Sequence, residues 1–259
     1  MDMDEMDMDK AGTQGMDLLE RAIAYALGTL LAVTREDLYR ATPCGVWDVG
    51  NLLAHLDDSV TALHEAAELG CVAPSPGPGP GMRTETGTGT ESGTDLGTGG
   101  NPGRNMGIGT HPGMGIREHP DMGPSTGAGG AGGRGGRDPV LVLRDRAATT
   151  LGAWAGTLRE QQVRFGRCSL PAATVAQAGA VEVAVHAWDL ARACGRPRPI
   201  PPALAADLLD VVPALVTNED RPARFAVPVD VPARSLAEDR LLAFLGRNPG
   251  WGAGRRLEL

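Results

Sequence analysis

Residues 46–56 read VWDVGNLLAHL and residues 181–191 read VEVAVHAWDLA, and both segments are predicted to be helical. Glu182 and His186 are four residues apart, so on a helix they lie on one face. His55 lies within an otherwise apolar part of its own segment. Two histidines and one glutamate leave one or two positions open on a divalent ion, as in working rather than sealed metal sites. The segments therefore predict a metal site if the three side chains meet.

Apolar residues recurring every three or four positions predict helices on both sides of these segments. Asp48 is a good N-cap and Gly70 a good terminator for the helix that carries His55. Helices joined by short links pack antiparallel, and ligand sites in such bundles are built from inward side chains. The predicted helices span residues 17–33, 48–70, 139–161, 172–193, 203–216 and 235–245, and residues 224–229 are predicted to be extended.

Two segments are predicted to lie outside the folded domain. Residues 72–138 are dominated by Gly, Pro, Thr and Ser, and cannot bury enough apolar area to offset their chain entropy. Residues 1–15 form an acidic tail. We therefore predict one domain built from residues 16–71 and 139–259, a disordered tail at residues 1–15 and a disordered Gly/Pro-rich insertion at residues 72–138.

Charge and composition argue against several classes of partner. The formal net charge is −8, and half of it comes from the five acids and one lysine of the N-terminal tail. The sequence shows no basic stripe and no aromatic stacking platform, so a nucleic-acid partner is not expected. It has no apolar run of 18 residues and no recognisable signal peptide, so we expect no membrane partner and a cytoplasmic location, with its four cysteines reduced.

Geometry selects among the five histidines. His111 and His119 lie in the predicted insertion, and His64 follows His55 by nine residues, which turns it to the opposite helix face. His55 and His186 remain. Taken alone, His55 has an alternative reading as a hydrogen-bonded core histidine, and the pair on the second helix could be an ordinary surface pair. The glutamate nevertheless lies among alanines and valines, where an unpaired carboxylate is costly to bury.

Two aspartates lie three residues after the histidines. Asp189 could accept a hydrogen bond from an imidazole and orient it, or it could form a surface contact with Arg192. Asp58 could play the same part for His55, with solvent exposure as the favoured alternative. The spacing leaves both alternatives open for Asp189.

Cysteine and tryptophan residues near the two segments have weaker interpretations. Cys44 precedes a helix start, where the helix dipole can lower a thiol pKa, but it lies about two turns from His55. A redox or ligand role for Cys44 is therefore the minor alternative. Trp47 is predicted to close one end of the bundle, and Trp188 is predicted to be a packing residue.

The two motifs resemble the mycothiol-dependent maleylpyruvate isomerase metal-binding domain family. Residues 42–56, with Thr42-Pro43-Cys44, Trp47, Val49 and Leu52-Leu53-Ala54-His55-Leu56, are similar to its first-histidine motif. Glu182 and residues 185–191 resemble its second motif, and residues 239–251 resemble the C-terminal end of an actinobacterial subgroup. The resemblance implies an all-α, DinB-like antiparallel four-helix bundle, here with additional C-terminal helices and a short extended segment.

The resemblance also implies a function. His55, Glu182 and His186 would hold one divalent ion, which we expect to be zinc, although nickel, iron or manganese could enter the same ligands. Mycothiol, a low-molecular-weight thiol, would serve as cosubstrate, and its thiolate would attack a small electrophilic substrate in an isomerase or transferase reaction. The chain departs from the isomerase in lacking a recognisable separate C-terminal domain and in carrying the insertion.

Two other readings of the same residues remain open. The protein could be a non-catalytic metal-binding or sensing bundle whose insertion contacts a partner. Alternatively, His55 and Glu182 could form a buried hydrogen-bonded pair without an ion.

Overall fold

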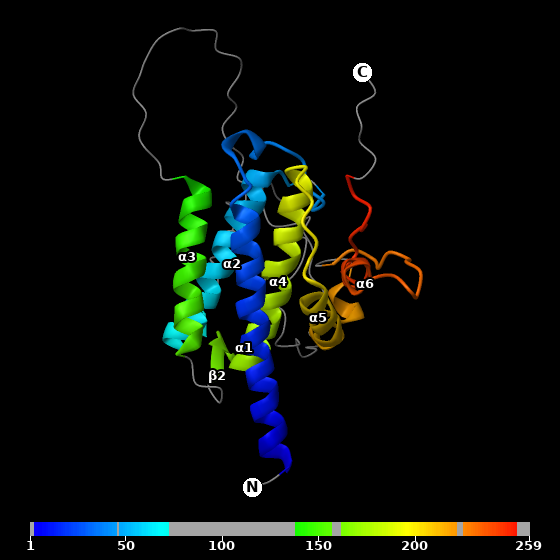
Figure 1. Cartoon of the computed structure of the whole chain (residues 1–259). Helices are drawn as coiled ribbons and strands as arrows, with labels where there is room; N and C mark the ends of the chain where they lie inside the picture. The colour runs from blue at the N-terminus through cyan, green and yellow to red at the C-terminus, as the bar shows by residue number, and fades with distance from the viewer. Residues whose placement is uncertain (1–2, 46, 73–137, 157–161, 222–224, 253–259) are drawn as a thin grey trace, which may run out of the picture.

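The fold is an all-α bundle with additional C-terminal helices, as predicted (Figure 1). The computed structural model describes residues 3–45, 47–72, 138–156, 162–221 and 225–252. Nearly all of the predicted insertion, residues 73–137, lies outside the described residues, so its predicted disorder stays a prediction. The bundle helices are α1 (Met3–Leu30), α2 (Val49–Leu69), α3 (Pro139–Ala155) and α4 (Ala172–Ala193). They are followed by α5 (Pro202–Leu215) and α6 (Ala237–Phe244), and the short 3₁₀ turns are η1 (Arg35–Asp37) and η3 (Asn218–Asp220).

The helices that position the site begin and end where the sequence predicts. Asp48 caps α2, because its carboxylate accepts a 2.7 Å hydrogen bond from the backbone N–H of Asn51. Gly70 ends α2 in the left-handed conformation, at φ 60°. The bounds predicted for α4 agree with the structure, and those of α5 and α6 agree to within two residues.

The directions of the helices correct one part of the prediction. Trp154 on α3 donates to the carbonyl of Leu63, and Thr150 donates to that of Val60, so α2 and α3 run in the same direction. In Figure 1, α1 and α4 run one way and α2 and α3 the other. The bundle is therefore not antiparallel throughout. The rule of antiparallel neighbours holds for short links, whereas α2 and α3 are separated in sequence by residues 70–138.

A small three-stranded sheet was not predicted. The strands β2 (Gln162–Phe165) and β3 (Cys168–Pro171) form an antiparallel hairpin, and β1 (Cys71–Val72) pairs in parallel with β2. The helix α3 accordingly ends at Ala155 instead of residue 161. Strands of two to four residues are too short to show a periodic pattern. The predicted extended segment at residues 224–229 belongs to no strand in its described part, residues 225–229.

The N-terminal segment is helical rather than a disordered tail over residues 3–15. The helix α1 begins at Met3, fourteen residues before the predicted start at Asp17. Residues 3–16 contain no proline. Adding turns to an existing helix also avoids the unfavourable nucleation step, so α1 can continue past its packed part.

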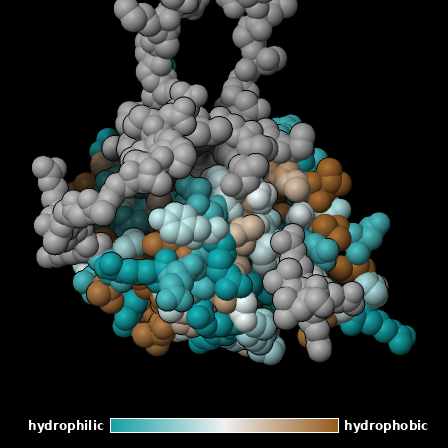
Figure 2. Space-filling model, turned by 90° about the horizontal axis from the view of Figure 1, so that it is seen from above, coloured by the Kyte–Doolittle hydropathy of each residue, from teal (hydrophilic) through white to brown (hydrophobic). Residues whose placement is uncertain are grey.

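The helix α4 lies at the centre of the core. Every residue from Ala178 to Ala191 is buried, and α4 packs against α1, α2 and α5. Any polar side chain on this stretch therefore needs a partner inside the protein. None of the described helices is both long and apolar enough to cross a membrane. Seen from above in Figure 2, the described residues show hydrophilic and hydrophobic side chains side by side, without one dominant apolar patch.

Candidate metal centre

The helices α2 and α4 bring His55, Glu182 and His186 together. The Oε1 atom of Glu182 lies 2.5 Å from Nε2 of His55 and 3.4 Å from Nε2 of His186. The two imidazole rings are 5.0 Å apart between centroids and nearly perpendicular, at 86°. One potential ligand atom from each residue lies within 4.8 Å of the other two. The three side chains that the sequence analysis selects therefore lie close together in the structure.

Local sequence explains why the two helices approach so closely here. Gly179 lies one turn before Glu182 on α4, and it faces Leu63 of α2. A Cβ atom at Gly179 would lie 2.5 Å from a methyl carbon of Leu63, well inside contact distance. The absent side chain lets α2 pack directly against α4, which is the approach that the three polar side chains need.

The donor set fits a divalent ion. Zinc binds imidazole nitrogen and carboxylate oxygen at about 2.0–2.2 Å, which places the ligand atoms of one ion roughly 3–3.5 Å apart. The 3.4 Å distance from Glu182 to His186 lies within that range, and the 2.5 Å distance to His55 is shorter, as in a direct hydrogen bond. Glu182 and His186 are almost fully buried, and His55 keeps 21 % of its side chain exposed. The three residues could therefore hold an ion and leave positions on it open to a further ligand.

Burial and charge act against each other at the two buried groups. Burial alone would raise the pKa of Glu182, but the two neighbouring imidazoles outweigh it and hold that pKa below its usual range. Burial would lower the pKa of His186, but the Glu182 carboxylate and the hydrogen bond to Asp189 raise it well above the ordinary value. Without an ion, the Glu182 carboxylate and the His186 imidazole therefore each favour the charged form of the other.

Asp189 orients His186, which resolves one of the alternatives that the sequence leaves open. Its Oδ2 atom lies 2.9 Å from Nδ1 of His186, and its side chain is fully buried. Its second partner is Arg247, not Arg192, with 3.0 Å from Nε and 2.9 Å from Nη2 to the carboxylate. Burial alone would raise the pKa of Asp189, but Arg247 and His186 lower it to about 2.

Cys44 lies closer to the site than its distance from His55 along the chain suggests. Its thiol donates to Asp189 at 3.1 Å and lies 3.7 Å from Nδ1 of His186. Burial and the nearby Asp189 carboxylate raise the pKa of Cys44, opposite to the lowering that a helix start can produce. Cys44 is therefore a neutral hydrogen-bond donor on the far side of the His186 ring from Glu182.

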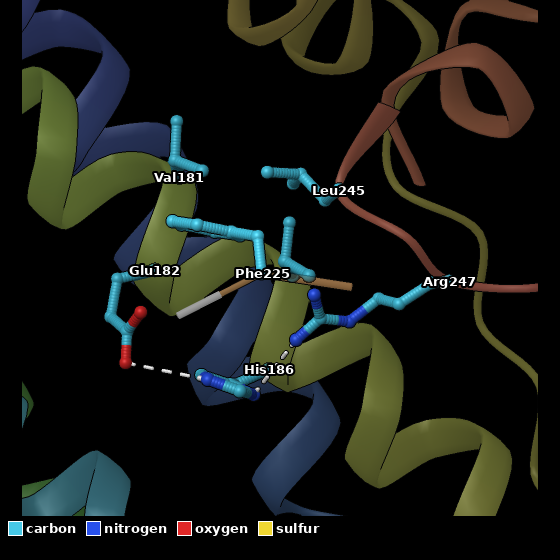
Figure 3. A pocket seen from close by; sticks show the side chains of 7 residues that line it. Val181, Glu182, His186, Phe225, Leu245 and Arg247 are labelled. Atoms are coloured by element: carbon cyan, nitrogen blue, oxygen red, sulfur yellow. Dashed lines mark hydrogen bonds and ion pairs between the residues drawn. The ribbon is translucent and has the colours of Figure 1, made fainter. Parts of the chain in front are cut away.

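A recess opens beside the candidate ion site, and three of its seven lining residues come from a segment that the sequence did not connect with the site (Figure 3). The C-terminal segment contributes Phe225, Leu245 and Arg247, which face Glu182 and His186 across the recess. The remaining lining residues are Val181 and Val185. No spacing rule connects residues so far apart in sequence; the only available signal was the resemblance of residues 239–251 to the end of a family subgroup.

The other tryptophan, aspartate and histidine residues considered from the sequence do not belong to the group of His55, Glu182 and His186. Trp47 is half-buried and packs against the His55 ring, at 4.9 Å between centroids. Trp188 is buried, as predicted, and donates to Glu238 at 2.8 Å. Asp58 is exposed, and His64 belongs to neither of the two potential ion-binding groups among the described residues. The predicted insertion histidines, His111 and His119, lie outside the described residues.

The bundle and its buried cluster of two histidines and a glutamate define a class: a helical-bundle protein with residues arranged to bind a divalent metal. The model of the mycothiol maleylpyruvate isomerase N-terminal domain matches residues 19–191, and the chain belongs to this family. The all-α architecture agrees with the DinB-like fold that the sequence resemblance implied. Comparisons with curated proteins and with solved structures found no match.

Proposed function

We propose that the protein is a mycothiol-dependent metalloenzyme of isomerase or transferase type. Its metal ligands would be His55, Glu182 and His186, with zinc as the resident ion and a cytoplasmic location. The observation that carries the proposal is the convergence of these three side chains at a partly open, otherwise buried position, in a member of a mycothiol-related family. A structural ion alone would not require an open side.

The chain's own residues can prepare the chemistry. When bound, the ion lowers the pKa of a coordinating thiol and so supplies thiolate near neutral pH. Glu182 would contribute a negative charge to a bound ion, and Asp189 holds the imidazole of His186 in place. Phe225 and Leu245 present apolar surface to the recess beside the ion position, which would limit the access of water to a thiolate on the ion.

Thiol turnover by metal-loaded protein tests this proposal. The purified chain should bind about one divalent ion. With mycothiol present it should either convert maleylpyruvate to an isomer, with the thiol regenerated, or join mycothiol to another small electrophile, faster than background. Chelation of the ion should abolish the rate, and zinc should restore it. A metal-loaded chain that shows no turnover with any electrophile of the panel would instead favour the non-catalytic metal-binding or sensing reading.

The metal-free protein should lose stability as the pH rises above neutral. The pKa of His186 is raised by folding, so its stabilising contribution is complete below the unfolded value of about 6.5 and disappears as the pH rises towards the folded value. The pKa of Glu182 is lowered by folding, so its contribution is present above about 4.3 and lost in acid. Urea unfolding between pH 5.5 and pH 9 should show this decline.

Zinc should remove the decline, because the positive charge of the ion would take the place of the proton that pairs with the Glu182 carboxylate. Metal affinity should then increase with pH, since the ligands must be deprotonated. Equal slopes of stability against pH with and without zinc would contradict the assignment of the two residues as ligands.

A further inference from the structure

The His186 ring uses its two nitrogens for different partners. Its Nε2 atom faces Glu182, and its Nδ1 atom lies 2.9 Å from Asp189. A neutral imidazole carries its proton on only one nitrogen and offers a lone pair on the other. If Nδ1 carries the proton and donates it to Asp189, Nε2 keeps its lone pair directed at the ion position.

Asp189 is itself held in place by the C-terminal segment. Arg247 reaches its carboxylate through both Nε and Nη2, and the two side chains are 5 % and 0 % exposed. A two-point pairing between a guanidinium and a carboxylate fixes the orientation of both planes as well as their distance. Cys44 adds a further donor at 3.1 Å. The Asp189 carboxylate therefore receives hydrogen bonds from Arg247 and Cys44, and towards Nδ1 of His186 it can only act as an acceptor.

The position of Arg247 depends on a turn that the family match does not cover. Gly246 adopts φ 77°, and the backbone N–H of Arg247 donates to the carbonyl of Leu242 at 2.9 Å. The segment is tied to α4 at two further points: Trp188 donates to Glu238, and Arg192 donates to the carbonyl of Pro249 at 3.1 Å. Figure 3 shows the guanidinium of Arg247 reaching from this segment towards His186.

Cys44, His186 and Asp189 also form a group with ion-binding geometry. Arg247 already supplies the positive charge of this group, because its Nη2 atom lies 3.5 Å from Nδ1 of His186 and 2.9 Å from Asp189. A second metal ion would meet this buried guanidinium at close range. The group is therefore better understood as support for one ion than as a second ion site.

We propose that Arg247 is a positioning residue for the metal centre: through Asp189 it fixes the proton of His186 on Nδ1 and leaves Nε2 free for the ion. The C-terminal segment, which lies beyond the matched family domain, thereby sets the affinity of a site whose ligands all lie within that domain. This inference rests on the proposed ligand set. It concerns the binding of the ion and not the reaction.

Cobalt binding tests the inference without any enzymatic assay. Co²⁺ should be titrated into metal-free protein while its visible absorption is recorded, with a competing chelator to measure the dissociation constant. Arg247→Met should weaken binding by about 10- to 100-fold, the usual effect of losing a residue that supports a ligand, and should alter the spectrum. Arg247→Lys should give an intermediate affinity, because lysine restores the charge but not the two-point contact.

Arg192→Met is the matched control. Arg192 anchors the same segment to α4 through Pro249 but does not contact Asp189 or His186. Its loss should lower the melting temperature while leaving cobalt affinity and spectrum unchanged. A folded Arg247→Met variant with the affinity and spectrum of the unaltered chain would overturn the inference. Failure of the unaltered chain to bind cobalt or zinc would instead reject the proposed ligand set.

A second measurement covers the case in which Arg247→Met does not fold. Long-range ¹H–¹⁵N NMR of the zinc-loaded, unaltered protein distinguishes the two nitrogens of each histidine ring. We expect His186 to show a protonated Nδ1 and a metal-bound Nε2. A metal-bound Nδ1 would contradict the inference whatever the variants do.

Discussion

Replacing His186 with alanine should reduce the affinity for a divalent ion by more than about 100-fold, beyond the usual effect of losing a supporting residue. The change removes one of three proposed ligands and leaves Glu182 with a single imidazole. The remaining pair, His55 and Glu182, would offer an ion only two protein ligands. Metal content after dialysis against a defined free zinc concentration, measured by mass spectrometry, gives the result directly.

His64→Ala provides the control for this experiment. His64 lies on the same helix as His55, nine residues further on, but it is not part of the ligand group. Its replacement should leave the metal content unchanged. Equal metal content in His186→Ala and the unaltered protein would show that any bound ion lies elsewhere, whereas loss in both variants would point to a general folding defect.

Trp188→Ala should destabilise the fold by about 3–5 kcal/mol, the usual range for removing a large aromatic side chain from a core. Trp188 is 1 % exposed, and its indole donates to Glu238 on α6 while Arg192 stacks over the ring. The alanine variant would leave a cavity between α4 and the C-terminal segment, and it would leave Glu238 without this donor. Urea unfolding followed by circular dichroism measures the change.

Trp188→Phe separates the contribution of core packing from that of the hydrogen bond to Glu238. Phenylalanine fills most of the volume but cannot donate to Glu238, so a loss of about 1 kcal/mol is expected. Trp47→Ala serves as a comparison, because Trp47 is only half-buried and should cost less. If Trp188→Ala unfolds at the same urea concentration as the unaltered protein, α6 and its neighbours contribute little to the stability of the bundle.

Local signals in the sequence predicted the ends of α2 and the residues that share a helix face. The caps at Asp48 and Gly70 fixed α2, and the i, i+4 spacing put Glu182 and His186 on one face. Pairing these residues with His55 required more, because the two helices are separated by more than a hundred residues. Burial of a carboxylate among small apolar residues provided the physical reason to expect a partner.

The features of the site that the sequence did not predict are contacts between residues that lie far apart in the chain. The ion pair of Asp189 and Arg247 joins residues 58 positions apart, and the contact of Cys44 with Asp189 spans 145 positions. Neither pair has a periodic signature. The spacing of Asp189 correctly allowed an orienting role, but it could not name Arg247 as the residue that holds the carboxylate in turn.

Because α2 and α3 run in the same direction, the chain that joins them must have a minimum length. β1 follows α2 and pairs with β2, which lies after the far end of α3, so Val72 and Asp138 lie at opposite ends of that helix. With 17 residues at 1.5 Å each, α3 is about 25 Å long. Even a fully stretched tether needs about eight residues to cover that span. A much shorter connection between α2 and α3 would therefore preserve the topology, but a tight hairpin would not.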